Sequence, residues 1–302
     1  MMIIDEDGRF RTRQLSGEYQ VVENLPPLQL VIPVDNGIAV LTQDNRVIFI
    51  KTMFVTDTIR SVMTIDSNNP QMNELIINDK VIDIIRYGFG FAILLDNGNL
   101  HYCNIDYDRI QVHQLLNSNV AKVSSRESAY MFIIDNCGRC CGIEGKVNIT
   151  EDIPGSIVSC RDGIFITDDG SSYIFDDDRS ESVIDLASNI KYHMTPVNLN
   201  HKCKIIDGMR PSRYITWIAT EDGIIHRYDT KTQSSTKLEH ELLNYIRFKR
   251  FVGSDVFEKA TFEDTNGNLY SIGIGDNLTR IDIGFRLYGY RESYSKAKRV
   301  VN

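Results

Sequence analysis

A strand–turn–strand pattern recurs along the chain about every forty residues. Four or five residues rich in Ile, Phe, Val, Leu and Ala precede a turn of Asp, Asn and Gly, and a polar residue followed by apolar or aromatic ones comes after it. The copies are FAILLDNGNLHYC (91–103), MFIIDNCGRCC (131–141), IFITDDGSSYIF (164–175), WIATEDGIIHRY (217–228) and ATFEDTNGNLYSI (260–272), with a copy that lacks the glycine, AVLTQDNRVIFI (39–50), and a half copy, MIIDEDGRFRTR (2–13). Such segments predict β-hairpins with type I′ turns, which need positive φ at both central residues.

Shorter apolar stretches lie upstream of the hairpins and supply further strands. They are LQLVIPV (28–34), KVIDIIRYG (80–88), VAKVSS (120–125), SIVSC (156–160), KIIDG (204–208) and RFVGS (250–254). The turns recur with an average step of about 43 residues, which leaves room for four short strands in each unit. Seven such units predict an all-β fold, a seven-bladed β-propeller. Only KLEHELLNYIRF (237–248) has the pattern of a helical turn or two.

The two ends of the chain fit a closed ring of blades. LTRIDIGFRLYG (278–289) reads like the opening strands of a blade without a hairpin, and the missing hairpin is at the other end, in residues 2–13. A last blade built from N-terminal hairpin strands and C-terminal strands would cover two exposed sheet edges. We therefore expect one propeller domain over residues 1–290 and a short basic tail over residues 291–302.

The order of apolar strand, Asp-Gly turn and apolar-aromatic strand resembles the repeat of the regulator of chromosome condensation family. KVIDIIRYGFGFAILLDNGNLHYCNID (80–106) and AKVSSRESAYMFIIDNCGRCCGIEG (121–145) match that repeat best, and the resemblance spreads over nearly the whole chain. It implies the propeller fold. Members serve as guanine-nucleotide exchange factors for a small GTPase, chromatin binders, tryptophan-based ultraviolet sensors or ubiquitin-ligase scaffolds. The sensor role needs several tryptophans, and Trp217 is the only one here, expected in the core.

The charge of the chain argues against a general nucleic-acid binder. The net charge is −8, from 33 Lys and Arg against 41 Asp and Glu, whereas binding to phosphates needs a basic surface. Basic residues do gather in IRFKR (246–250) and in the tail RESYSKAKR (291–299). The candidate contacts to a partner or to nucleic acid are Arg247, Lys249, Arg250, Lys296, Lys298 and Arg299. The competing interpretation is that these charges are solvated loop and tail residues.

Composition and the start of the chain predict an intracellular protein. The sequence opens on MMIIDEDGRF without a basic-then-apolar leader, so we expect no secretion through a signal peptide. The longest apolar runs have four to six residues, against roughly 20 for a membrane span, so we expect no membrane insertion. The six cysteines are then free thiols. Abundant Ile, Asn, Asp and Lys are typical of an A+T-rich genome, which makes a viral source and a place in a virion an alternative.

Two motifs suggest a metal site, and the repeat explains both. Cys137, Cys140 and Cys141 have a metal-like spacing, but zinc needs four ligands and no second pair lies nearby in sequence. Cys140 and Cys141 align with strand residues of other copies, with a redox pair or an intermolecular disulfide as the alternative. The acidic turns at residues 5–8 and 168–170 begin like a calcium loop but lack its remaining ligands. We interpret them as turn residues and predict no metal and no cofactor.

No linear motif points to catalysis. The six histidines lack metal-binding spacings, and nucleophile-elbow, Walker and dinucleotide fingerprints are missing. His101 and His226 fall at similar repeat positions, which favours a structural role. Gly88-Phe89-Gly90 is interpreted as a bend. We therefore expect a protein that is not an enzyme, although residues from several blades could still meet in an axial channel.

Two functions from different classes remain. The favoured hypothesis is a non-catalytic platform whose variable loops bind a protein partner on a rigid frame. The alternative is a chromatin- or DNA-associated propeller that uses the basic segments, and guanine-nucleotide exchange is a further one. The sequence leaves the partner, the binding face and the oligomeric state open.

Overall fold

The computed structural model of the chain describes most of its length. The described residues are 2–13, 18–34, 37–56, 61–64, 71–106, 109–116, 119–126, 130–142, 147–148, 152–177, 192–199, 203–212, 214–254, 259–273 and 277–282. They contain no α-helix and one short 3₁₀-helix, η2 (Glu241–Asn244). The chain divides into two compact units, Met1–Tyr130 and Met131–Asp282. Each unit is described by itself below.

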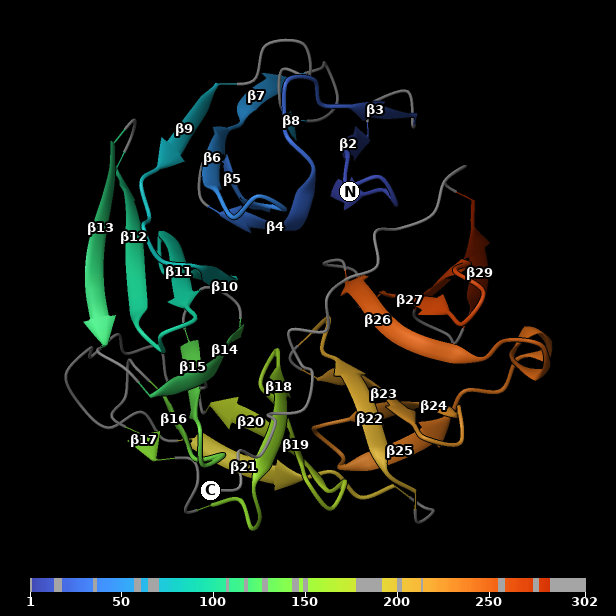
Figure 1. Cartoon of the computed structure of the whole chain (residues 1–302). Helices are drawn as coiled ribbons and strands as arrows, with labels where there is room; N and C mark the ends of the chain where they lie inside the picture. Colours follow the sequence, from blue (N-terminus) through green and yellow to red (C-terminus); the bar gives the residue numbers. More distant parts are fainter. Residues whose placement is uncertain are drawn as a thin grey trace. The chain divides into compact units, whose positions relative to one another are not determined.

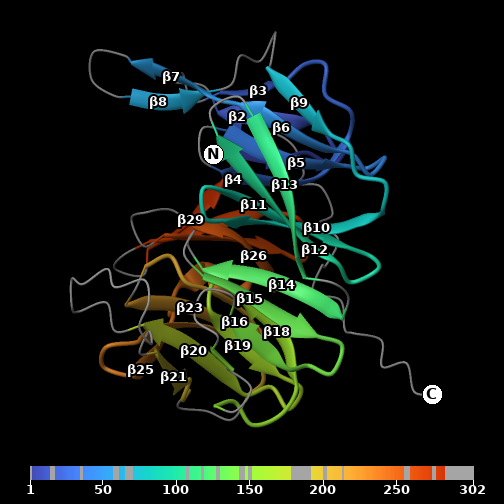
Figure 2. The same ribbon diagram turned by 90° about the vertical axis from the view of Figure 1, so that its left-hand side faces the viewer.

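Antiparallel sheets follow one another along the chain (Figure 1). The first is three-stranded, with β1 (Met2–Ile4), β2 (Phe10–Arg13) and β3 (Tyr19–Val21). The next two have the orders β4 (Leu28–Val34), β5 (Gly37–Thr42), β6 (Val47–Lys51), β9 (Met72–Leu75) and β10 (Val81–Tyr87), β11 (Gly90–Leu95), β12 (Leu100–Asp106), β13 (Arg109–Leu116). A separate hairpin of β7 (Met53–Thr56) and β8 (Ser61–Thr64) projects from the second sheet (Figure 2).

Four more sheets repeat the same order of strands. They are β14 (Val120–Arg126), β15 (Tyr130–Asp135), β16 (Cys140–Gly142), β17 (Val147–Asn148); β18 (Ile157–Arg161), β19 (Ile164–Thr167), β20 (Ser172–Asp177), β21 (Tyr192–Pro196); β22 (Ile205–Met209), β23 (Ile215–Thr220), β24 (Ile225–Asp229), β25 (Ser234–Lys237); and β26 (Phe248–Ser254), β27 (Ala260–Asp264), β28 (Leu269–Ile272), β29 (Leu278–Ile281). Seven successive antiparallel sheets make the fold a seven-bladed β-propeller, as the repeat predicts.

The second strand of a sheet is its most apolar one because it is covered on both faces. All six residues of β5, β11 and β23 are buried, which explains their unbroken apolar runs. In the first unit β4 lies beside β10 and β10 beside β14, and in the second unit β22 lies beside β26. The core of the second unit includes Trp217, which is fully buried, and His226 is buried as well. The predicted core position of Trp217 is confirmed, and of the two histidines predicted to be structural His226 is buried while His101 is only half-buried.

A five-residue turn joins the second and third strands of every four-stranded sheet, and a turn of the same kind joins β1 to β2 in the first sheet. In each turn the first residue donates its N–H to the carbonyl of the fifth, and the fourth donates to the carbonyl of the first, as in Thr167–Ser171 and Asp264–Asn268. Only the fourth residue has positive φ, for example Gly170 at +84° and Asn45 at +70°. This is a three-residue loop with a bulge glycine and not the predicted type I′ turn, because the third residue keeps an ordinary backbone conformation.

Type I′ geometry occurs elsewhere in the fold. Asp162 and Gly163, between β18 and β19, both have positive φ. Gly88 and Phe89 connect β10 and β11, with positive φ at Gly88 alone, so the predicted bend there is confirmed. The sequence thus located the hairpins correctly but assigned the two-residue turn type to the wrong connection.

Several of the turns also tie a sheet to the next one within a unit. The N–H of Leu28 donates to the carbonyl of Gly8 at 2.7 Å, and Val120, Ile157 and Ile205 donate to the turn glycines before them at 3.3 to 3.4 Å. Gly170 lies so close to the chain before β22 that a Cβ on it would be 2.9 Å from Cβ of Lys204. Gly223 differs, since no heavy atom lies within 4 Å of a Cβ built there. These contacts fix neighbouring sheets through backbone groups.

The ends of the described chain differ from the predicted composite blade. Leu278–Ile281 pairs with Leu269–Ile272 and completes its own sheet as the fourth strand. It does not open a new blade, because hairpin β27–β28 needs an outer partner and Leu278, opposite Ile272 in the pairing, is buried there. Tyr19–Val21 adds a third strand to the N-terminal hairpin. The predicted blade strands at residues 283–289 and the tail lie outside the described residues.

Candidate partner-binding surface

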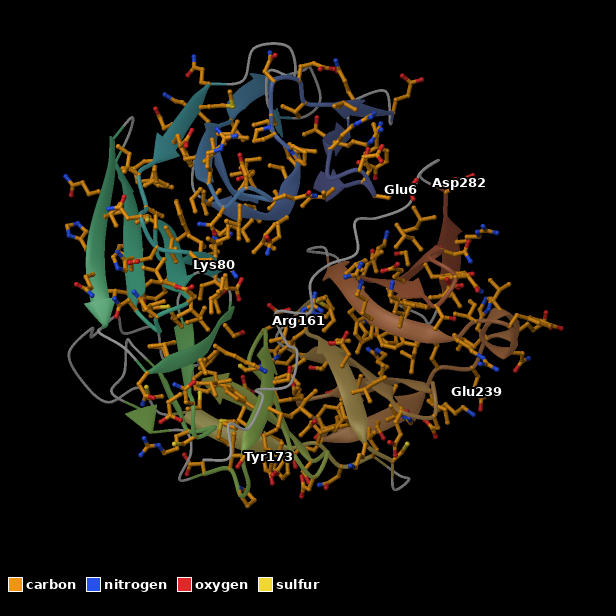
Figure 3. The ribbon with its side chains drawn as sticks, in the orientation of Figure 1. Glu6, Lys80, Arg161, Tyr173, Glu239 and Asp282 are labelled. Carbon is orange, nitrogen blue, oxygen red and sulfur yellow. The ribbon has the colours of Figure 1, made fainter. Side chains whose placement is uncertain are left out.

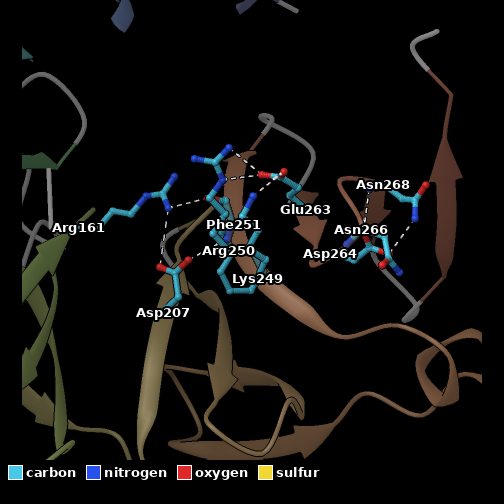
Figure 4. Close-up of polar contacts among 9 residues, drawn as sticks. All are labelled: Arg161, Asp207, Lys249, Arg250, Phe251, Glu263, Asp264, Asn266 and Asn268. Atoms are coloured by element: carbon cyan, nitrogen blue, oxygen red, sulfur yellow. Dashed lines mark hydrogen bonds and ion pairs between the residues drawn. The ribbon is translucent and has the colours of Figure 1, made fainter. Parts of the chain in front are cut away.

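The backbone of Phe251 in β26 is held by side chains of two other sheets (Figure 4). Its N–H donates to Oδ2 of Asp207 at 2.8 Å, and its carbonyl accepts from a terminal guanidinium nitrogen of Arg161 at 2.9 Å. The same nitrogen lies 3.7 Å from Oδ1 of Asp207. Because β26 is the first strand of its sheet, one edge of its backbone has no strand partner, and these side chains satisfy it. Three sheets of the second unit are joined in this way.

Asp207 sits in a register bulge that recurs in the first strands. The pairing of β22 with β23 shifts between Ile205 and Asp207, as it does between Val81 and Asp83 in β10. Desolvation raises the pKa of Asp207, while the Arg161 guanidinium and the N–H groups of Phe251 and Gly208 oppose that rise. Asp83 has only the N–H of Ile84 as a counterweight, and desolvation raises its pKa to about 7. Equivalent carboxylates therefore have different environments in the two units.

The predicted basic contacts on β26, Lys249 and Arg250, share one buried carboxylate, that of Glu263. Lys249 Nζ lies 2.9 Å from Oε1 of Glu263, and a guanidinium nitrogen of Arg250 lies 2.6 Å from Oε2 (Figure 4). The Glu263 side chain is only 5% exposed. Arg247 is exposed, and its carbonyl accepts from the N–H of Thr265. Lys296, Lys298 and Arg299 lie outside the described residues, so the structure brings together only Lys249 and Arg250 of β26, through Glu263, with Arg247 directly before the strand.

The loop before β26 presents apolar side chains that sequence reasoning did not select. Its 3₁₀-helix η2 confirms the predicted helical turn, and Nδ1 of His240 accepts the N–H of Leu242 at its start. Leu238 and Ile246 at the two ends of the loop are buried in the core of the second unit. Leu242 and Tyr245 remain 39% and 84% exposed. The segment HELLNYI (240–246) contains more apolar residues than the core can bury, and this excess could have indicated an exposed apolar surface from the sequence alone.

Charges at the two ends of this loop have opposite signs. Glu239 and Glu241 are exposed at its beginning, and Glu239 lies at the outer margin of the second unit, away from Arg161 (Figure 3). Arg247 and Lys249 follow at its end. The apolar residues thus lie between an acidic end and a basic end. Such an arrangement can orient a bound chain by charge.

The acidic turns satisfy their own backbone. Oδ1 of Asp5 accepts the N–H groups of Asp7 and Arg9, and Oδ1 of Asp169 accepts the N–H of Ser171 and the hydroxyl of Thr167. The turn interpretation of these residues agrees with the structure, since these oxygens are occupied by hydrogen bonds. In the described ranges no group of three His, Cys, Asp or Glu side chains could hold a metal ion.

The cysteines of the 137–141 segment are turn and strand residues. Cys140 is buried in β16, and desolvation raises its pKa far above the ordinary range of a thiol. Cys141 points to the exposed side of the strand, and Cys137 is exposed in the turn. Alternate strand residues point to opposite faces, which accounts for this pattern. In the part of the chain that the structure describes, no helix is long and apolar enough to cross a membrane.

Comparison with known proteins supports the fold. No family model and no curated protein sequence matches the chain. The chain is similar to the crystal structure of human WBSCR16 with a TM-score of 0.61 and 8% identity, over 88% of this chain and 85% of the other. It is similar to the Cps50 (Swd1) β-propeller domain of Myceliophteria thermophila with a TM-score of 0.54 and 10% identity, over 91% of each chain. YCF48 bound to D1 peptide gives a TM-score of 0.54 and 9% identity, over 87% and 86%.

These comparisons define the protein as a β-propeller. The identities of 8 to 10% are so low that they show the fold alone. The narrower resemblance to the regulator of chromosome condensation family stays a prediction.

Proposed function

We propose that this chain is a non-catalytic β-propeller platform that binds a protein partner. The observation that carries the proposal is the exposure of large apolar side chains on ordered connections of a rigid frame. Tyr245 is 84% exposed, and Phe89, in the β10–β11 turn of the first unit, is 72% exposed. Aromatic side chains of this kind supply most of the binding free energy in many protein interfaces. Hydrogen-bonded turns hold the strands from which these connections emerge.

A similar fold with a bound peptide supports this proposal. YCF48 is recorded in complex with D1 peptide, so a propeller of comparable size accommodates a peptide ligand. For this chain the alternative is a DNA-associated propeller using Arg247, Lys249 and Arg250. The pairing of Lys249 and Arg250 with Glu263 lowers the positive charge available to phosphates, which makes the protein partner the better-supported proposal.

Affinity purification with quantitative mass spectrometry tests the platform function. The wild-type chain is compared with a double variant, Phe89→Ser and Tyr245→Ser, whose folding is checked by circular dichroism. We expect proteins that the wild type retains and the variant loses. Equal retention by both, or no retained protein, would refute the proposal. Retention of 30-base-pair duplex DNA at 50 mM salt would favour the alternative instead.

A further inference from the structure

The loop between β25 and β26 has two sides that differ in what they contact. A 3₁₀-helix has about three residues per turn, so side chains three apart lie on the same side. Leu243 and Ile246 form one such pair, and both pack against the core of the second unit. Leu242 and Tyr245 form the other pair, and both are exposed. The core contacts therefore fix the loop in a position that directs Leu242 and Tyr245 to solvent.

The end of η2 leads directly into basic residues. Arg247 is exposed, with no salt bridge recorded for its guanidinium among the described residues, and Lys249 is 45% exposed beside Glu263. Arg247 directly precedes β26, and its carbonyl accepts the N–H of Thr265; with Phe248 buried between them, Arg247 and Lys249 are both exposed, and residues two apart in an extended chain lie roughly 7 Å from each other on the same face. We call Leu242, Tyr245, Arg247 and Lys249 the η2 surface. It joins an apolar pair to two cations within eight residues of chain.

We propose that the η2 surface binds a linear segment of the protein partner that carries an acidic side chain next to a large apolar one. The apolar side chain contacts Leu242 and Tyr245, and the carboxylate pairs with Arg247 and Lys249. This proposal rests on the platform function. Glu239 and Glu241 at the other end of the loop repel an acidic residue there, so the acidic side chain of the segment lies at the Arg247 end.

The charged and the apolar residues of the η2 surface contribute to binding in different ways, so they can be tested separately. Arg247 provides the unshared charge, because Lys249 already contacts a carboxylate at 2.9 Å. Tyr245 provides the larger apolar area, and aromatic anchors of this kind usually weaken binding about tenfold or more when truncated to alanine. Replacing Arg247 with Glu should weaken an acidic segment and favour a basic one. A charge swap can therefore identify the acidic contact independently of the apolar one.

Panning a phage-displayed library of random 12-residue peptides on the full chain tests the proposal. The most enriched peptide is then synthesised with a fluorescein label and titrated by fluorescence polarisation. We expect enriched sequences with Asp or Glu next to a large apolar residue. Binding should weaken at least about tenfold in Tyr245→Ala, and the control Ile76→Ala, at an apolar residue of the first unit that is 94% exposed, should bind like the wild type.

A charge-swap pair completes the test. Arg247→Glu should lose affinity for the acidic peptide and regain it for the same peptide with Lys in place of its acidic residue. Unchanged affinity in both Tyr245→Ala and Arg247→Glu, or failure of the library to yield any binding peptide, would overturn the proposal. Partner proteins retained equally by wild type and Tyr245→Ala would overturn it too while leaving the platform function in place. If the wild-type chain retains no protein at all, the platform function itself is refuted.

Discussion

The turn glycines should differ in their tolerance of alanine according to what lies next to them. Gly170 and Gly223 occupy the same place in successive sheets of the second unit, with φ of +84° and +83°. Alanine pays the same backbone cost at both, about 1–2 kcal/mol, partly offset by about 0.4–1 kcal/mol from the less flexible unfolded chain. At Gly223 no heavy atom lies within 4 Å of the new Cβ, so alanine has no steric conflict there. We expect Gly223→Ala to destabilise by roughly 1 kcal/mol or less.

Gly170→Ala adds a steric conflict between two sheets. The new Cβ would lie 2.6 Å from Cγ and 2.9 Å from Cβ of Lys204, both too close for real contacts. Lys204 precedes β22, and its neighbour Ile205 donates its N–H to the Gly170 carbonyl at 3.4 Å. Moving Lys204 away weakens this hydrogen bond, worth about 1 kcal/mol. Gly170→Ala should therefore lower the free energy of unfolding by about 1–2 kcal/mol more than Gly223→Ala does.

Urea denaturation followed by the fluorescence of Trp217 measures this difference. Trp217 is the only tryptophan and is fully buried in the same unit, so it reports on both variants. With a denaturant slope of about 3 kcal/mol/M, the midpoints of the two variants should differ by roughly 0.5 M urea. Equal midpoints would show that the turn of one sheet does not restrain the next, and would refute our account of how the sheets are held together.

Three further changes test the buried polar groups and the loop. Asp83→Asn should stabilise the protein, because burial raises the folded-state pKa of Asp83 to about 7 and the wild type therefore loses stability as pH rises from about 4 to 7, by up to about 4 kcal/mol at about 1.4 kcal/mol per pKa unit. The gain in urea midpoint should be larger at pH 8 than at pH 5, and an equal gain at both would contradict this. Glu263→Gln should lower the free energy of unfolding by about 1–3 kcal/mol, because Arg250 then lacks its carboxylate partner. An unchanged melting temperature would show that this ion pair does not stabilise the fold. His240→Ala should speed hydrogen exchange at Leu242, and His240→Asp should restore slow exchange, because either side chain can cap η2; equal exchange in all three would rule out the cap.

Local regularity explains how much of the fold the sequence predicts. Apolar stretches at 28–34 and 120–125 coincide with β4 and β14 because strand and turn signals are encoded by neighbouring residues. The turn type was wrong since an Asp-Gly pair fits both a two-residue turn and a three-residue loop with a bulge glycine. The placement of Leu278–Ile281 was wrong because strand pairing depends on which hairpin lacks an outer partner.

The candidate surface was only partly predictable. The basic run at Arg247–Arg250 is visible in sequence, but its partner Glu263 lies in the following strand and became evident only from the pairing of β26 with β27. The contacts of Arg161 and Asp207 with Phe251 join residues up to 90 positions apart. Such contacts depend on neighbouring sheets and leave no local pattern. The exposure of Tyr245 depends on which loop residues the core accepts, which spacing alone does not define.

Hydrogen–deuterium exchange of the full chain, free and bound to the enriched peptide, tests the central claim most directly. The claim is that a rigid propeller presents the η2 surface to its partner. We predict slower exchange on binding over residues 238–250, with the hairpin strands of the same unit unchanged. Protection that spares this loop and falls on the β10–β11 turn around Phe89, or exchange that rises across all sheets, would contradict the account.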